Sequence, residues 1–184
     1  MNLTKLFEMQ RELDERIVKE KGLEGKDLLP QKILALQVEL GECANEWRGF
    51  KFWSKDQQPR YEKKSIAFAD PGGPFEHVSY PLLEEYIDCL HFILSIGIHY
   101  GYDGSISKGW EFVLSRTTPT TFITSRFIEL MDYTCDLQSH HDFYADFLWC
   151  FLDLGYMLGF NWQQISDAYM DKNKTNHERQ STGY

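Results

Sequence analysis

Apolar residues recur at helical spacing along the first fifty positions of the chain. Residues 3–20 predict an amphipathic helix, because apolar side chains recur there every three or four positions. These side chains are Leu3, Leu6, Leu13 and Ile17. Gln10 occupies the position where the next apolar member of that face is expected. Residues 30–48 predict a second helix, which opens with Pro30 in its first turn and ends before Gly49.

Residues 82–100 are apolar on almost every face, which is typical of a helix buried in the middle of a bundle. Further helical patterns cover residues 106–115, 120–138 and 142–159 and a stretch from 162, for which Asn161 is the expected N-cap. No strand pattern, repeat or low-complexity tract is convincing. We therefore predict an all-α helical bundle that forms a single domain over residues 1–184.

The segment between the second and third predicted helices, residues 51–80, shows no sustained hydrophobic period. It is rich in Lys, Gln, Pro and Gly and includes the run DPGGP at residues 70–74. Such a composition is typical of a connection without regular structure. We predict a long mobile connection here, of the kind that enzymes use as a lid.

Composition narrows the class of protein. The 184 residues are 42% hydrophobic, which is enough to build one core and excludes overall disorder. A net charge of -9 excludes the electrostatic footprint of a duplex nucleic-acid binder. The four cysteines show no close pairing, the first residues lack the apolar core of a secretory signal, and no apolar stretch is long enough to span a membrane. We expect a cytoplasmic protein without a membrane partner.

Carboxylates gather on the second and third predicted helices. Glu39, Glu42 and Glu46 share one face of the second helix, and Glu85 and Asp88 lie within the apolar third helix. Neither helix interior offers a basic residue, and unpaired buried carboxylates are costly, so divalent cations are the expected counter-ions. Oxygen ligands without His or Cys favour Mg²⁺, with Mn²⁺ as the other candidate, and four carboxylates can hold two metal ions.

Three segments around these acids carry a resemblance to a known family. They read ELGECANEW from residue 39, FKFWSK from residue 50 and LEEYIDCLHF from residue 83. Together they resemble the dimeric all-α dUTPases of the superfamily that includes the MazG pyrophosphohydrolases. The resemblance runs from Gln10 to the C-terminal tail, although residues 51–80 and 102–118 match no motif of that family. It implies hydrolysis of dUTP to dUMP and pyrophosphate, and a homodimer.

The resemblance also implies roles for the acids. Glu39, Glu42, Glu85 and Asp88 would bind Mg²⁺, and either Glu39 or Glu42 would orient the attacking water and take its proton. Water is then the nucleophile, and no covalent intermediate is needed.

Further residues are candidates for binding dUTP. Gln10 either sets helix register or reads the base, and its donor and acceptor match the adjacent carbonyl and N–H of uracil. Trp53 is expected to close over the ligand. His91 and Phe92 follow Asp88 by one turn, and the ring of Phe92 would support a deoxyribose. Core packing is the alternative for His91 and Phe92.

The tail, residues 170–184, is predicted to bind phosphate. Three donors share one face of the last predicted helix, namely Lys172, Asn176 and Arg179. The alternative is a basic helix end favoured by the helix dipole.

Three other functions compete with dUTP hydrolysis. One is a related pyrophosphohydrolase that prefers dCTP or a modified nucleotide. Another is a di-iron bundle, since Asp88 and His91 form a D-x-x-H step, but the chain holds no second step of that kind. The third is a non-catalytic interaction protein, against which the intact set of acids argues.

Overall fold

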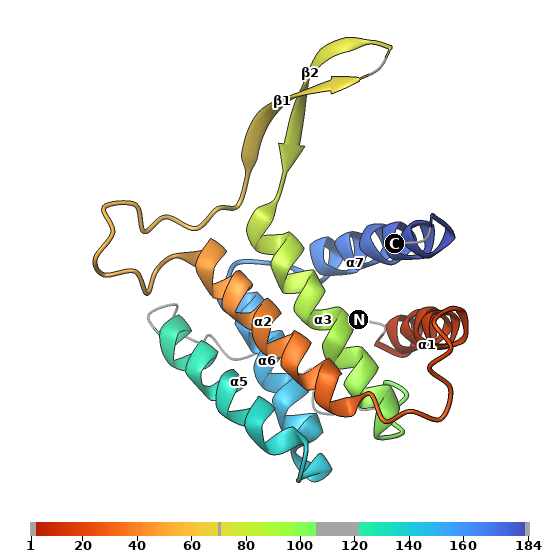
Figure 1. The fold of residues 1–184 in the computed structure, drawn as a ribbon. Helices are drawn as coiled ribbons and strands as arrows, with labels where there is room; N and C mark the ends of the chain where they lie inside the picture. Colours follow the sequence, from red (N-terminus) through yellow and green to blue (C-terminus); the bar gives the residue numbers. More distant parts are fainter. Residues whose placement is uncertain (1–2, 70, 106–121, 183–184) are drawn as a thin grey trace.

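The chain forms a helical bundle from which one β-hairpin projects (Figure 1). The computed structural model describes residues 3–69, 71–105 and 122–182. The helices are α1 (Leu3–Glu20), α2 (Leu29–Trp47), α3 (Pro81–His99), α5 (Ile123–Leu137), α6 (Tyr144–Met157) and α7 (Trp162–Ser181), with a short 3₁₀ turn at His141–Phe143 before α6. The predicted helices at 3–20, 30–48, 82–100, 120–138, 142–159 and from 162 are therefore confirmed, whereas the one expected at 106–115 lies outside the described residues. The all-α fold class is confirmed as well.

The prediction that the chain contains no strand is wrong at residues 63–79. Strands β1 (Lys63–Ala69) and β2 (Gly73–Ser79) pair antiparallel, with Lys63 opposite Ser79. Gly73, at the start of β2, has a φ of 79°, which a residue with a side chain rarely adopts. The hairpin stands away from the bundle in Figure 1, and almost every described residue in it is exposed. With no face buried, its strands lack the alternation of apolar and polar residues by which a strand is recognised.

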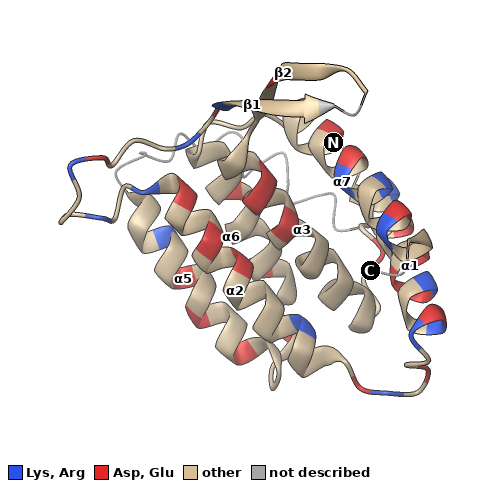
Figure 2. Cartoon of the chain, turned by 45° about the horizontal axis from the view of Figure 1, so that its top comes forward, with Lys and Arg blue, Asp and Glu red and all other residues tan. Residues whose placement is uncertain are grey.

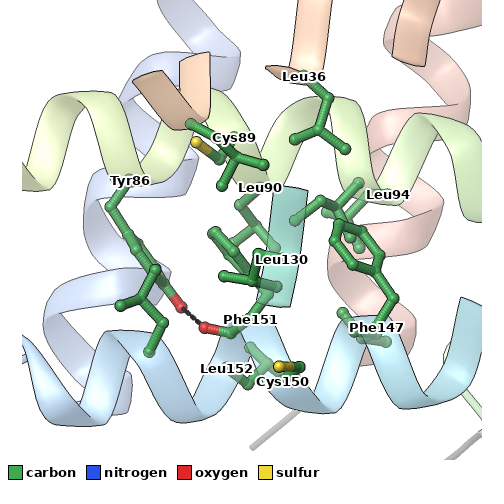
Figure 3. Packing of buried hydrophobic residues seen from close by; sticks show 14 of the residues in the cluster. Leu36, Tyr86, Cys89, Leu90, Leu94, Leu130, Phe147, Cys150, Phe151 and Leu152 are labelled. Carbon is green, nitrogen blue, oxygen red and sulfur yellow. Dashed lines mark hydrogen bonds between the residues drawn. The ribbon is translucent and has the colours of Figure 1, made fainter. Parts of the chain in front are cut away.

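Helix α3 is the central helix, as its apolar pattern predicts. It packs against α1, α2, α6 and α7, and most of its side chains are buried. Figure 3 shows the packing between α3 and α6, where the Tyr86 ring stacks on Phe151 with ring centroids 4.4 Å apart. The Tyr86 hydroxyl donates to the backbone carbonyl of Phe151. This core holds α3 in place, so that its remaining polar face can carry a site.

The ends of two helices follow their local sequence. The side chain of Asn161 accepts a hydrogen bond from the backbone N–H of Gln164, whose own side chain accepts from Asn161, so the predicted N-cap of α7 is a capping box. Helix α2 has Pro30 in its first turn and ends at Trp47, and the C-cap residue Arg48 adopts the left-handed conformation at φ 64°. Among the described residues, no helix combines the length and the hydropathy needed to cross a bilayer.

Candidate active site

Three carboxylates from two neighbouring helices meet at one point. Glu39 of α2 and Glu85 and Asp88 of α3 each place an oxygen within 4.8 Å of the other two, and we call these three residues the acidic cluster. All three are half-buried. Figure 2 shows acidic residues in red along α2 and α3, which lie side by side. The predicted meeting of acids from the second and third helices is therefore present in the structure.

The position of the acidic cluster follows from the apolar residues beside it. Leu40 and Cys89, which directly follow Glu39 and Asp88, are completely buried in the core. Because one residue advances a helix by about 100°, the preceding acid then lies at the edge of the buried face. The packing of α2 against α3 therefore brings the acids together at the rim of their interface.

The cluster carries more negative charge than its surroundings balance. Burial raises the pKa of Glu39 to about 7, and the charges of Asp88 and Glu42 act in the same direction. Burial also raises the pKa of Glu85 to about 7, assisted by the charges of Glu42, Asp88 and Glu39. Both carboxyls would lose their protons more easily beside a cation. The site is therefore suited to bind positive charge.

The other two glutamates on the acidic face of α2 have different surroundings. Glu42 is exposed, and its charge acts on Glu39 and Glu85 although it is outside the group that meets within 4.8 Å. Glu46 instead accepts hydrogen bonds from the Arg60 guanidinium at 3.0 and 3.2 Å. Glu46 therefore anchors the segment after α2, and Glu42 is a neighbour of the acidic cluster.

Lys172 of α7 reaches the acidic cluster directly. Its ammonium donates to Asp88 Oδ2 at 2.5 Å. The positive charge of Lys172 lowers the pKa of Glu39 and Glu85, but burial and the neighbouring carboxylates outweigh it, so that both pKa values remain raised. The cation that the interiors of α2 and α3 lack thus comes from α7. Asn176 and Arg179, the other candidate phosphate donors, lie one and two turns further along α7, where Asn176 is half-buried and Arg179 exposed.

Gln10 lies in a buried network of hydrogen bonds between α1, α3 and α7. Its Nε2 donates to Asp14 Oδ1 at 2.7 Å. Its Oε1 accepts from the Tyr169 hydroxyl at 2.8 Å and lies 2.7 Å from His91 Nδ1. The amide at the predicted apolar position is thus paired on both of its ends.

His91 is a buried member of this network. Its side chain is 6% exposed and stacks on the Tyr169 ring with centroids 4.3 Å apart. Burial, together with the charge of Lys172, lowers the pKa of His91 to about 3, so the ring is neutral at physiological pH. Its Nε2 is buried and has no hydrogen-bond partner among the described residues. Phe92, the next residue, is partly buried and packs against the core.

Asp14 is a member of the network that the pattern of the sequence does not single out. Its Oδ2 accepts from the Ser95 hydroxyl and from Lys32 Nζ, the latter at 3.2 Å. Asp14 follows Gln10 by four residues and Ser95 follows His91 by four, so each pair shares a helix face. That spacing is the signal by which Asp14 and Ser95 could have been found from the sequence.

Trp53 lies in the segment between α2 and β1 and is 65% exposed. Its ring packs edge-on against Phe50 and Phe52, with centroids 5.8 and 5.0 Å away. Its expected role in closing over a ligand stays a prediction.

A cavity of about 310 Å³ lies between α3 and α7 beside the acidic cluster. Its lining includes Ile87 and Glu84 of α3 and Ala168, Asp171 and Lys172 of α7. Lys172, which donates to Asp88 of the acidic cluster, also lines the cavity. The volume of the cavity is at the lower end of the range for small-molecule sites.

Comparisons with known proteins add one match. A family model described as dUTPase matches residues 2–71 and 76–184 of the chain. The matched residues include the acidic cluster, Gln10, His91 and Lys172, and the gap between the two ranges falls at the start of β2. A comparison with curated protein sequences gave no match.

Proposed function

The chain belongs to the family of all-α dimeric dUTPases, and from this premise we propose that it cleaves dUTP between the α- and β-phosphates with Mg²⁺ as its cofactor. The products are dUMP and pyrophosphate. Hydrolysis of dUTP is the activity of the family, and the acidic cluster is the observation that carries the metal dependence.

The residues of the site fit a hard divalent cation. Glu39, Glu85 and Asp88 offer oxygen ligands close together. Glu42 lies near enough for its charge to raise the pKa of Glu39 and Glu85, and these raised pKa values favour a cation at the site. We assign these four residues as the Mg²⁺ ligands. Bound Mg²⁺ supplies charge that neutralises the phosphate oxygens and lowers the pKa of the attacking water.

The side chains of the chain itself position the water and the phosphates. Glu39 or Glu42 orients the attacking water and takes its proton. Lys172, Asn176 and Arg179 donate to phosphate oxygens from α7. Lys172 is paired with Asp88 in the structure, and its ammonium would be released to donate to a phosphate oxygen if Asp88 held a cation instead. The tail at residues 170–184 is thus proposed to bind the leaving pyrophosphate.

The nucleoside is assigned to four residues from three segments. Gln10 has one amide N–H beyond the one that faces Asp14, and this N–H can donate to a carbonyl of the base. His91 contributes its buried Nε2. Phe92 supports the deoxyribose, and Trp53 closes over the nucleotide from the segment after α2.

A pyrophosphate-release assay with a panel of nucleoside triphosphates tests this function. We expect turnover of dUTP that requires Mg²⁺ and exceeds turnover of dCTP and the other nucleotides. The Glu39→Gln variant keeps the shape of the side chain but removes a ligand charge, so its rate is expected to fall about 100-fold or more. Preferred turnover of dCTP, or turnover that persists in EDTA, would contradict the proposal.

Glu46→Gln is the matched control for Glu39→Gln. Glu46 lies two turns further along the same face of α2, but its carboxylate is bonded to Arg60. We therefore expect this variant to keep nearly the wild-type rate. Equal losses of rate in both variants would mean that turnover depends on the whole acidic face of α2, which comprises Glu39, Glu42 and Glu46, and not on the acidic cluster alone.

We also propose that the enzyme is a homodimer, as its family is. Leu34 and Val38 on α2 are 62% and 51% exposed, which is apolar surface that a second copy could cover. Light scattering coupled to size exclusion is expected to give twice the mass of 21.7 kDa. The double variant Leu34→Glu/Val38→Glu is expected to shift the mass toward the monomer, and a monomeric wild-type protein would contradict the proposal.

A further inference from the structure

A relay of hydrogen bonds leads from Asp14 to the ring of His91. Asp14 Oδ1 accepts from Gln10 Nε2 at 2.7 Å, and Gln10 Oε1 lies 2.7 Å from His91 Nδ1. We call Asp14, Gln10 and His91 the polar relay. Asp14 itself is held by Lys32 and by Ser95, which both donate to its other oxygen.

The chemistry of the groups fixes the direction of every bond in the relay. A carboxylate can only accept hydrogen bonds, so Asp14 forces the NH₂ end of the Gln10 amide toward itself. The Gln10 oxygen must then face His91 and the Tyr169 hydroxyl. Since that oxygen is an acceptor, His91 Nδ1 must be the donor. The proton of the neutral ring is therefore on Nδ1.

The remaining ring nitrogen of His91 is consequently an acceptor. Nε2 is buried without a partner among the described residues, and His91 is only 6% exposed. A buried acceptor left without a donor is costly, which points to a ligand that brings one. Because Nε2 is covered, the side chains over it must move when that ligand binds.

We propose that Asp14 is a positioning residue that sets the base preference of the enzyme without touching the nucleotide. Through Gln10 it keeps His91 Nε2 as an acceptor, and this acceptor takes the N3–H of a uracil ring. Cytosine has a lone pair at N3, so the two lone pairs would face each other and dCTP would be rejected. The inference rests on the proposed dUTP hydrolysis and deepens it by naming what enforces the preference.

The variant Asp14→Asn reverses the relay at nearly constant shape. Lys32 and Ser95 continue to donate to the remaining side-chain oxygen, so the new NH₂ group faces Gln10. The Gln10 amide must then turn over and present its own NH₂ to His91. His91 Nδ1 becomes an acceptor, the ring proton moves to Nε2, and the site presents a donor that suits N3 of cytosine.

The ratio of kcat/KM for dUTP to kcat/KM for dCTP is the kinetic readout. In Asp14→Asn we expect this ratio to fall about 10-fold or more, with kcat/KM for dCTP rising in absolute terms. General damage to the fold would lower both values and leave their ratio unchanged. Ser95→Ala is the matched control, because it removes one donor to Asp14 but leaves the bond to Gln10, so its ratio should equal that of the wild type.

Nitrogen-15 NMR of the histidine rings in the metal-free full-length protein gives a second readout, with the His91 signals assigned through His91→Gln. We expect the proton on Nδ1 in the wild type and on Nε2 in Asp14→Asn. A proton on Nε2 in the wild type would overturn the relay even if Asp14→Asn failed to fold. If the wild type prefers dUTP and the ratio is unchanged in Asp14→Asn, the relay is also overturned, whereas a wild type without that preference would overturn the proposed function.

Discussion

Asp88 illustrates how much of the site depends on a single residue and its neighbours. Helical spacing alone places Asp88 with Glu85 on one face of α3, and the apolar residues around them predict that both acids are shielded from solvent. The sequence therefore predicts that Glu85 and Asp88 meet Glu39, although Glu42, the expected fourth member, lies outside the acidic cluster. It does not predict that Lys172, 84 residues away, donates to Asp88. That bond depends on how α7 crosses α3, which no local pattern encodes.

The pKa values of Glu39 and Glu85 lead to a prediction about pH. Both are raised from 4.5 to about 7, so between these values the folded protein binds more protons than the unfolded chain. Their contribution to the free energy of unfolding is fully present below about pH 4.5 and is lost as pH rises through about 7. In Glu39→Gln and in Glu85→Gln, the free energy of unfolding is therefore expected to fall less steeply with rising pH than in the wild type. The difference in slope should be less than about 1.4 kcal/mol per pH unit, because solvent screens half-exposed groups.

Urea unfolding in EDTA at pH 5, 6 and 7 measures this effect as the difference between each variant and the wild type. The comparison with the wild type is needed because His91, whose pKa is lowered to about 3, contributes stability that is lost as pH falls and so opposes the two glutamates. Glu46→Gln is the control and should leave the wild-type slope unchanged. Identical slopes in all the variants would show that the acidic cluster is not coupled to folding.

At the scale of elements, a segment could be predicted where one of its faces is buried. Helices α1, α2 and α3 each bury one face or more, and their apolar spacing predicted them almost to the residue. The hairpin buries neither face, since Ile66 on one face and Phe75 on the other are 73% and 47% exposed. Its strands are held by backbone hydrogen bonds, which leave little trace in the order of side chains.

Removing the hairpin tests whether the bundle depends on it. We expect that replacing residues 63–79 by a short Gly-Ser linker leaves the midpoint of thermal unfolding within about 2 °C of the wild type, because exposed residues contribute little to stability. Circular dichroism at 222 nm measures the midpoint. Leu94→Ala, a truncation in the core, is the reference and is expected to cost about 2–5 kcal/mol. If removal of the hairpin lowered the midpoint of thermal unfolding as much as Leu94→Ala does, the hairpin would have to pack against the bundle or against a second copy.

The whole molecule carries a net charge of -9 and concentrates unbalanced carboxylates at one rim of its core. A cation that binds this rim binds the folded chain and not the unfolded one, because Glu39 of α2 and the acids of α3 meet only when the two helices pack. Metal binding and folding are therefore expected to be linked.

Mg²⁺ is expected to raise the unfolding midpoint of the whole protein. At a concentration 100 times its dissociation constant the stabilisation is about 2.7 kcal/mol, which corresponds to roughly 5–10 °C for a chain of this size. Differential scanning calorimetry measures the shift, with NaCl at matched ionic strength as the control for general screening of the negative charge. Asp88→Asn should respond to Mg²⁺ no more than to NaCl. An equal response of wild type and variant would place the metal elsewhere.

The hairpin also divides the acidic cluster along the chain. Glu39 precedes β1, whereas Glu85 and Asp88 follow β2, and the broad contact between α2 and α3 reunites them. A chain cut between the two strands would give two fragments, neither of which holds all three carboxylates of the acidic cluster. The tip of the hairpin is thus the place to divide this protein into a split-enzyme reporter, in which catalysis returns only when two fused partners bring the halves back together.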